Sequence, residues 1–398
     1  MTAALIEFEE ARALVLEHTR PLEAETVALG EALGRVLAQE IRAPEDVPAF
    51  DNSAMDGFAV RAADTAAGVR LRVVGESRAG APADVVVGPG EACAISTGAA
   101  MPGGADAVVR VEDTRREGDE VELVVAVELD RDVRHAGEDV RAGEPILATG
   151  QRIGAAELGL LASAAHASVL VGARPKVALV TTGDELIAVD EPMRPGAVRN
   201  SGRYVIPALV AAAGGETVSV AHVHDEPEVV AEAIAVALAA DVAVITGGMS
   251  VGVHDHVREA LDSLGVTRHF AGVALKPGKP ASFGSRGETL VFGLPGNPVS
   301  SLMCFQLFAR PALLALAGER PQRARTLATI DEDLELTPGR MHAARCRLVL
   351  AADGWHATTT GPQGSHILSS MLGAEAIALI PAGDGVLRAG AQITVELL

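Results

Sequence analysis

The sequence predicts a multidomain α/β protein with a doubly wound sheet, a β-rich inserted module, a helical segment and a small C-terminal β-barrel. Two patterns predict it. Between residues 175 and 318, short apolar runs alternate with helical segments four times, as in a parallel sheet with right-handed crossovers. Elsewhere, valine-rich runs separated by Gly, Pro and Asp are typical of strands joined by turns.

The pattern of apolar residues changes along the N-terminal part of the chain. Residues 1–40 carry apolar side chains at helical spacing, as in FEEARALVLE, which predicts one or two helices. From residue 41 to about 132, runs such as LRVVGE and DAVVRVED predict a β-rich module. A Gly-rich connection follows, and then GAAELGLLASAA, which predicts a helix that packs back on the first ones.

The C-terminal part begins after Pro175. The runs KVALV, TVSVAHV, DVAVIT and TLVFGL predict strands, and a helical segment follows each of them. From about residue 319 the runs RTLATI, ARCRLVL, AIALIPAG and AQITVEL are separated by turns, which predicts a small β-barrel or sandwich.

Composition excludes several classes of protein. The 398 residues carry 33 Lys+Arg against 53 Asp+Glu, a net charge of −20, which disfavours binding to nucleic acid or to a membrane. The three cysteines are far apart and form no CxxC, which disfavours a disulfide framework or a cysteine zinc site and fits a reducing compartment. No apolar run reaches the roughly 20 residues of a membrane span, and no signal peptide is recognisable. We therefore expect a cytoplasmic protein.

Four glycine-bearing or polar loops follow the predicted strands of the doubly wound sheet. In such sheets ligands bind outside the carboxyl ends of the strands, and glycines let backbone N–H groups approach an anion closely. Each loop alone is equally typical of an ordinary turn, but together they predict a site for a phosphate-bearing ligand. The loops are TTGDE (181–185), HDEP (224–227), TGGMSVG (246–252) and LPGNP (294–298).

Charged residues outside these loops add three candidates. Lys276 and Lys279 of KPGKP are compact cations suited to phosphate, although the segment also fits a solvated turn. Asp255 fits either a helix cap or a ligand for a divalent cation beside phosphates. Asp51, in FDNSAMDGFA, is either functional or the first residue of a capped turn bonded to the N–H of Ser53.

Eight motifs occur in one order along most of the chain: FDNSAMDGFAVR, ISTGAAMPGGADAVV, RHAGEDV, TTGDEL, TGGMSVGVHDH, KPGKP, GLPGNPVSS and GPQGSHILSSM. Together they resemble the MoeA family, the molybdopterin molybdenumtransferases, whose relatives include the E-domain of gephyrin. The resemblance implies that adenylylated molybdopterin and molybdate give molybdenum cofactor and AMP, with Mg²⁺ assisting. The oxyanion specificity, molybdate or tungstate, stays open because the two ions are so similar in size and charge.

The resemblance also implies four domains and a homodimer. A helical domain comprises residues 1–40 and 135–174, a β-rich domain 41–134, a doubly wound molybdopterin-binding-like domain 175–318, and a β-barrel domain 319–398. In the family, the active site lies between the doubly wound domain of one subunit and parts of the other. The adenylyltransferase of the same pathway is a further candidate partner.

The family's functional residues carry over onto this sequence motif by motif. The resemblance implies catalytic roles for Asp51, Thr97, Arg134, Asp139, Glu185 and Asp225, and metal ligation by Asp255 and Asp225. It implies substrate binding by Thr182, Gly183, Gly247, Gly248, Ser250, Gly252, Lys276, Lys279, Pro295, Gly296, Asn297, Pro298 and Ser365. Two positions depart from the family pattern: Phe58 replaces a more usual Tyr, and Gly272 stands where many members have a basic residue.

Three other functions compete with molybdenum insertion, and the least favoured of them is a nucleotide-pyrophosphate hydrolase with a related domain. A molybdopterin adenylyltransferase uses the same TGGxSxG and PGNP loops, so residues 175–318 alone do not discriminate. A scaffold protein is the alternative of another class, but the sequence has no long linker, second domain set or aromatic docking stripe. The DNSAMDG module and the C-terminal barrel favour molybdenum insertion.

Overall fold

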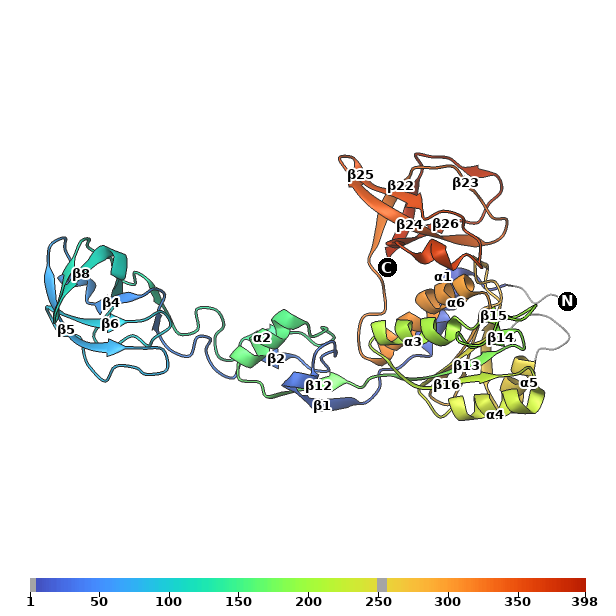
Figure 1. Ribbon diagram of the computed structural model, residues 1–398, viewed down its shortest axis with the longest axis horizontal. Helices are drawn as coiled ribbons and strands as arrows, with labels where there is room; N and C mark the ends of the chain where they lie inside the picture. The colour runs from blue at the N-terminus through green and yellow to red at the C-terminus, as the bar shows by residue number, and fades with distance from the viewer. Residues whose placement is uncertain (1–4, 249–255) are drawn as a thin grey trace. The chain divides into compact units, whose positions relative to one another are not determined.

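The structure is a computed structural model that describes residues 5–248 and 256–398. Two compact units divide it. One unit comprises residues 1–25, 34–38 and 170–398, and the other comprises residues 26–33 and 39–169. Figure 1 labels elements of both units. The predicted fold class, a multidomain α/β protein, is confirmed.

The larger unit is built on a six-stranded sheet in the order β16-β13-β17-β21-β20-β18. The first four of these strands are parallel, as predicted. The last two, which were not predicted, are antiparallel, so the complete sheet is mixed. The strands are β13 (Lys176–Thr182), β16 (Glu216–Val223), β17 (Val242–Thr246), β18 (Thr267–Ala271), β20 (Ser282–Arg286) and β21 (Thr289–Leu294).

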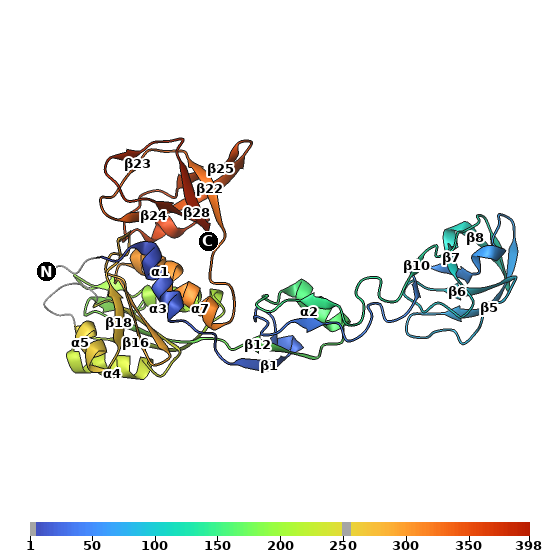
Figure 2. The same ribbon diagram turned by 180° about the vertical axis from the view of Figure 1, so that it is seen from behind.

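Helices cover both faces of this sheet, which explains why its central strands are apolar on both sides. In β13, Val177 and Leu179 face one core, whereas Ala178 and Val180 face the other. The first core receives α1 (Phe8–Glu17), α3 (Gly202–Ala212), α6 (Pro298–Cys304), η4 (Phe305–Ala309) and α7 (Arg310–Leu316). The second receives α4 (Pro227–Ala237) and α5 (His256–Ser263), on the opposite face in Figure 2.

The apolar stretch Pro298–Leu316 is, among the described residues, the one helical segment long and apolar enough to cross a membrane. Its most apolar window is 83% buried inside the protein. Phe305, Leu307 and Leu313 lie in the core that contains β13 and β21. The segment is therefore a core helix of the larger unit.

The C-terminal strands close into a barrel. The ring runs β24-β25-β22-β28-β26 and closes where β26 pairs again with β24. Alanines such as Ala344, Ala357 and Ala378 fill its interior, and small side chains suit a barrel of this size. Its strands are β22 (Arg325–Ile330), β24 (Met341–Ala351), β25 (Gly354–Thr359), β26 (Ala376–Ile380) and β28 (Gln392–Leu397).

Short elements complete the larger unit. Strand β19 (Leu275–Lys276) extends the barrel sheet by pairing in parallel with β24. The others are β14 (Leu186–Ile187), β15 (Val198–Arg199), β23 (Leu334–Glu335), β27 (Val386–Leu387) and η5 (Leu368–Met371).

The smaller unit contains a six-stranded sheet in the order β7-β4-β6-β5-β9-β8, so the β-rich module is confirmed as β structure. The valine-rich runs bury side chains on both of its faces, with Val60 and Val109 in one core and Cys93 and Val108 in the other. Its strands are β4 (Gly57–Val60), β5 (Arg70–Ser77), β6 (Glu91–Ile95), β7 (Ala107–Arg110), β8 (Thr114–Glu117) and β9 (Glu120–Leu123).

The remaining elements precede, follow or connect the strands of this sheet in the sequence. Over residues 1–40, where one or two helices were predicted, the structure has one α-helix, α1, which β1 follows. The helix predicted from GAAELGLLASAA is present as α2 (Ala155–Ser163). Short ladders join β1 (Ala24–Ala28) with β12 (Ser168–Gly172), β2 (Ile41–Arg42) with β11 (Pro145–Leu147), and β3 (Asn52–Ser53) with β10 (Val133–Arg134). Single 3₁₀ turns are η1 (Leu29–Glu31), η2 (Ala62–Asp64) and η3 (Val111–Asp113).

Candidate functional site

Three of the predicted loops meet at one edge of the mixed sheet. Strands β13, β17 and β21 are neighbours, and Thr181, Thr246 and Leu294 stand opposite one another in their ladders. The segments that follow therefore emerge side by side. A Cβ on Gly247 would lie 2.2 Å from the carbonyl oxygen of Thr182, so only glycine allows this approach. The structure thus brings together Thr182, Gly183, Gly247, Gly248, Pro295, Gly296, Asn297 and Pro298.

Thr182 carries an unpartnered polar atom at this edge. Its side chain is 1% exposed, and its Oγ1 has no hydrogen-bond partner among the described residues. The neighbouring Thr181 is satisfied, because it receives a hydrogen bond from Asn200 at 2.9 Å. A buried hydroxyl left unbonded costs about 1–3 kcal/mol, so Thr182 has a reason to meet a ligand atom.

Carboxylates gather where β13 and its neighbour β16 end. Glu185 folds over Gly183, where a Cβ would lie 2.5 Å from the Glu185 carboxylate. Asp225 follows β16, and its backbone N–H donates to Asp184 Oδ1 at 3.2 Å. This hydrogen bond, together with one from His224, lowers the pKa of Asp184. Asp184 was not among the predicted residues, although TTGDEL contains it.

The two lysines of KPGKP differ in their surroundings. Lys276 is half-buried, and its Nζ donates to Thr337 Oγ1 at 3.4 Å, whereas Lys279 is exposed. Neither forms an ion pair with a carboxylate within residues 5–248 and 256–398. The backbone sets the loop between them, because Gly278 has φ +122° and a Cβ there would lie 2.5 Å from Cys304 Sγ.

Ser365 comes from the barrel, and its carbonyl accepts the N–H of Val299 at 3.1 Å. The loop GPQGSH therefore lies beside Asn297 and Pro298 at the start of α6. Arg345 fixes this loop by hydrogen bonds: its guanidinium donates to Ser370 Oγ at 2.7 Å and to the carbonyls of residues 362–364. Sequence reasoning missed Arg345, although an arginine between alanine and cysteine in an apolar strand was a signal.

Arg345 is 0% exposed, and all its partners are neutral. Burial lowers the pKa of its guanidinium. In the part of the chain that the structure describes, no carboxylate forms an ion pair with it. Its positive charge is therefore left to act on whatever anion binds nearby.

Four other predicted residues lie in the smaller unit. Asp51 Oδ1 accepts the N–H of Ala136 at 2.8 Å, and His135 Nδ1 lies 3.4 Å from Oδ2. The backbone bond is the main reason that the pKa of Asp51 is lowered. The N–H of Ser53 goes to Ala99 instead, so the alternative in which Asp51 bonds Ser53 is wrong.

Thr97, Arg134 and Asp139 share this loop cluster. The N–H of Thr97 donates to Asp56 Oδ1 at 2.7 Å, and Arg134 stands opposite Asn52 in the ladder of β10 and β3. Asp139 lines a cavity of about 370 Å³ with residues 135–138, Arg141 and Glu144. Asp51 and its three companions are therefore grouped within the smaller unit, whereas Glu185 and Asp225 belong to the larger one.

The predicted metal site is only partly described. Ser250, Gly252 and Asp255 lie outside the described residues. Within the described ranges, no group of three or more His, Cys, Asp or Glu side chains has the arrangement of a metal site. The remaining predicted ligand, Asp225, is exposed and lies next to Asp184, and carboxylate oxygen is the donor that Mg²⁺ prefers.

Comparisons with known proteins agree with this arrangement. Residues 6–165 match the MoeA N-terminal region (domain I and II), 178–315 a probable molybdopterin binding domain, and 328–398 the MoeA C-terminal region (domain IV).

Curated relatives and a solved structure cover nearly the whole chain. The molybdopterin molybdenumtransferase of Synechococcus elongatus is 36% identical, covering 95% of both chains. That of Haemophilus influenzae is 33% identical, covering 98% of both. A crystal structure of the molybdopterin biosynthesis moeA protein from Pyrococcus horikoshii OT3 has a TM-score of 0.81 at 30% identity, covering 99% of this chain and 100% of that one. The chain therefore belongs to the MoeA family of molybdopterin molybdenumtransferases, enzymes of molybdenum cofactor biosynthesis.

Proposed function

We propose that this chain binds adenylylated molybdopterin together with molybdate, inserts molybdenum into the pterin and releases AMP. One observation carries the proposal: the glycine-bearing loops after β13, β17 and β21 meet the barrel loop of Ser365 at one edge of the sheet. Backbone N–H groups in such loops suit phosphate oxygens.

Positive charge in this region serves the departure of AMP. Breaking the phosphoanhydride bond concentrates negative charge on the leaving phosphate, and preorganised cations stabilise that charge. Lys276 and Lys279 have no carboxylate partner among the described residues, so their charge is available to the substrate. Arg345 positions the loop of Ser365 and adds a buried charge. These contacts also suit molybdate, which is a dianion.

A magnesium ion is the assisting cation of the proposed reaction, and Asp225 at the same edge offers it a carboxylate oxygen. Asp225 and Asp255 would hold it, and when bound it would neutralise phosphate charge. We therefore expect Asp255→Asn to lower activity at limiting Mg²⁺, and excess Mg²⁺ to restore part of it. If Asp255 only caps a helix, the variant keeps wild-type turnover at limiting Mg²⁺, because Asn caps about as well as Asp.

The loop cluster of the smaller unit supplies positioning. Asp51 is a carboxylate with a lowered pKa that holds the chain at Ala136, so we assign it positioning or proton handling rather than anion binding. Thr97, Arg134 and Asp139 share its loops, and Glu185 with Asp225 completes the proposed catalytic set.

We further propose that the enzyme is a cytoplasmic homodimer and that the adenylyltransferase of the same pathway is its protein partner. Light scattering tests the dimer by a particle of twice the 40.8 kDa chain mass. The chain's full-length resemblance to molybdenumtransferases favours insertion over the adenylyltransferase and scaffold alternatives.

AMP release tests the proposed reaction. Purified protein receives adenylylated molybdopterin and Mg²⁺, with and without molybdate, and AMP is measured over time. We expect AMP release that requires molybdate and is accompanied by molybdenum in the pterin product. Equal AMP release without molybdate would instead indicate a hydrolase.

A further inference from the structure

His342 is a buried imidazole whose hydrogen-bonding capacity is unused. It is 5% exposed, and neither ring nitrogen has a hydrogen-bond partner among the described residues. Native proteins satisfy most buried polar groups, and each one left unbonded costs about 1–3 kcal/mol. An imidazole at this position therefore needs a reason other than packing.

The neighbours of His342 identify the chemistry that it faces. In the parallel ladder of β19 and β24, His342 stands opposite Lys276, so both side chains leave the sheet on the same face. Lys276 Nζ reaches Thr337 Oγ1 at 3.4 Å, and Thr337 is 6% exposed. An ammonium group has three N–H donors, so this single long bond leaves donors for another acceptor.

The charges around His342 explain its protonation state. Burial, together with the smaller effect of the positive charges of Lys276 and Arg345, lowers the pKa of His342 to about 4. Strand β26, on the other side, contributes Ile380 and no charge at this register. The free protein therefore holds a neutral imidazole beside a lysine ammonium. A bound anion beside the ring would stabilise the imidazolium and so oppose the effects of burial and of the two cations.

We propose that His342 is a positioning residue for the tetrahedral oxyanion that Lys276 binds, that Thr337 orients the lysine beside it, and that His342 takes up a proton from solvent as the anion binds. The inference rests on the proposed function and deepens it, because Lys276 is one of its substrate-binding lysines. The oxyanion is either free molybdate or a phosphate of the adenylylated pterin, and both present the same acceptor oxygens.

Binding titrations across pH test this coupling. Molybdate alone and ADP-ribose, a disubstituted pyrophosphate that does not itself titrate here, are each titrated into the full chain by calorimetry between pH 6 and 8. We expect one of them to bind more tightly as pH falls, by up to about tenfold per pH unit, with uptake of up to one proton. The probe that shows this behaviour identifies the source of the oxyanion.

Two variants show whether His342 is the group responsible. His342→Gln keeps an N–H donor but does not titrate, and His342→Leu removes all polar atoms at similar volume. We expect pH-independent binding in both variants, with affinity retained better in His342→Gln. We expect an unchanged or higher thermal midpoint for His342→Leu, because unbonded polar atoms are removed.

Three results would overturn the proposal: pH-independent binding by the wild type, the same pH dependence in both variants, or binding of neither probe. Its failure is distinguishable from failure of the proposed function. Molybdate-dependent AMP release by the wild type together with pH-independent binding would reject only the role of His342. Loss of molybdate-dependent AMP release in the wild type would reject the proposed function itself.

Discussion

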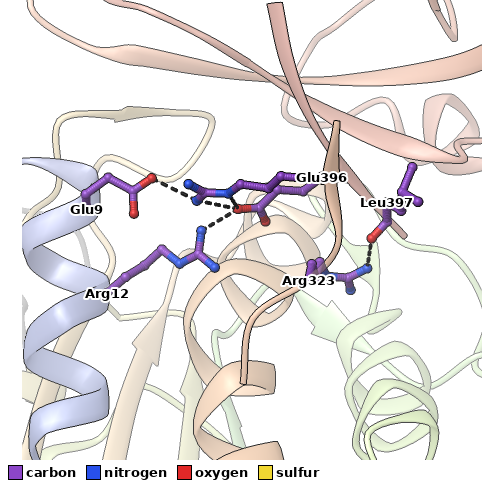
Figure 3. A network of polar contacts seen from close by, with 6 residues as sticks. Glu9, Arg12, Arg323, Glu396 and Leu397 are labelled. Atoms are coloured by element: carbon purple, nitrogen blue, oxygen red, sulfur yellow. Dashed lines mark hydrogen bonds and ion pairs between the residues drawn. The ribbon is translucent and has the colours of Figure 1, made fainter. Parts of the chain in front are cut away.

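Two buried arginines of the larger unit have opposite surroundings. Arg12, on α1, is 9% exposed and forms an ion pair with the fully buried Glu396, as Figure 3 shows. Arg325 donates to the same carboxylate at 2.7 Å and to Glu9 at 2.8 Å. Arg345 is fully buried, but its guanidinium donates only to a hydroxyl and to backbone carbonyls.

The difference separates structural charge from functional charge. A buried cation paired with a carboxylate leaves little field around it, and removing one partner is strongly destabilising. A buried cation with neutral partners keeps its field, and Arg345 does so in a chain with a net charge of −20. We therefore expect the pair of Arg12 and Glu396 to hold the barrel against α1, and the unpaired cations to serve anion binding.

The largest expected effect comes from breaking the paired group. Glu396→Gln leaves Arg12 buried without a counterion, so we expect the free energy of unfolding to fall by about 3–5 kcal/mol. Urea denaturation measures it, and AMP release per folded molecule should stay unchanged. Glu9→Gln is the control, because Glu9 is exposed and its pair with Arg325 contributes about 0–1 kcal/mol. Equal losses in the two variants would contradict the account.

The next effect concerns acid stability. The folded pKa of His342, about 4, lies below its ordinary value of 6.5, so the unfolded chain binds this proton first as pH falls. The neutral ring's contribution is complete above about pH 6.5 and is lost as pH falls towards about 4. This loss is on the order of 3 kcal/mol. Unfolding free energies at pH 5 and 7 should differ less in His342→Leu than in wild type, and identical differences would count against a neutral buried ring.

Lys279→Met should have a smaller effect on the free energy of unfolding but a direct effect on ligand affinity. This lysine is exposed and unpaired among the described residues, so Lys279→Met should change stability by no more than about 0.5 kcal/mol. Affinity for adenylylated molybdopterin should fall ten- to hundredfold, the equivalent of about 1.5–3 kcal/mol. The loss should shrink at high salt because screening weakens the wild-type contact. An unchanged dissociation constant would remove Lys279 from the site.

Much of the larger unit was predictable because its signals are local. KVALV and DVAVIT contain strands that are buried on both faces, and such strands are apolar at nearly every position. The loops after them meet because parallel neighbours end at the same edge. The antiparallel strand β18 was missed because its sequence, TRHFA, begins with three polar residues and therefore contains no apolar run. One helix, α1, forms within residues 1–40, where one or two were predicted; β1 follows it because it pairs with β12, a contact that helical spacing does not show.

The parts that were missed depend on contacts distant in sequence. Asp51 meets Ala136, 85 residues away, and local turn chemistry alone suggested Ser53 instead. Arg345 lies in an apolar strand, but nothing nearby in sequence says that its partners are the carbonyls of residues 362–364. His342 stands opposite Lys276 in the ladder of β19 and β24, and both of its ring nitrogens are unbonded among the described residues. No local sequence pattern predicts this pairing, because the two residues are far apart in the chain.

The most direct test compares Lys276→Met with Arg12→Met in two measurements on each protein: the thermal midpoint and the dissociation constant for adenylylated molybdopterin. We predict that Lys276→Met binds ten- to hundredfold more weakly with a nearly unchanged midpoint, because its charge serves the ligand. We predict that Arg12→Met has a clearly lowered midpoint, because the charge of Arg12 neutralises the buried Glu396. At temperatures below that midpoint, its affinity for the ligand should equal that of the wild type. Wild-type affinity in Lys276→Met, or weakened binding in Arg12→Met at a temperature where it is folded, would contradict the division between structural and functional charge.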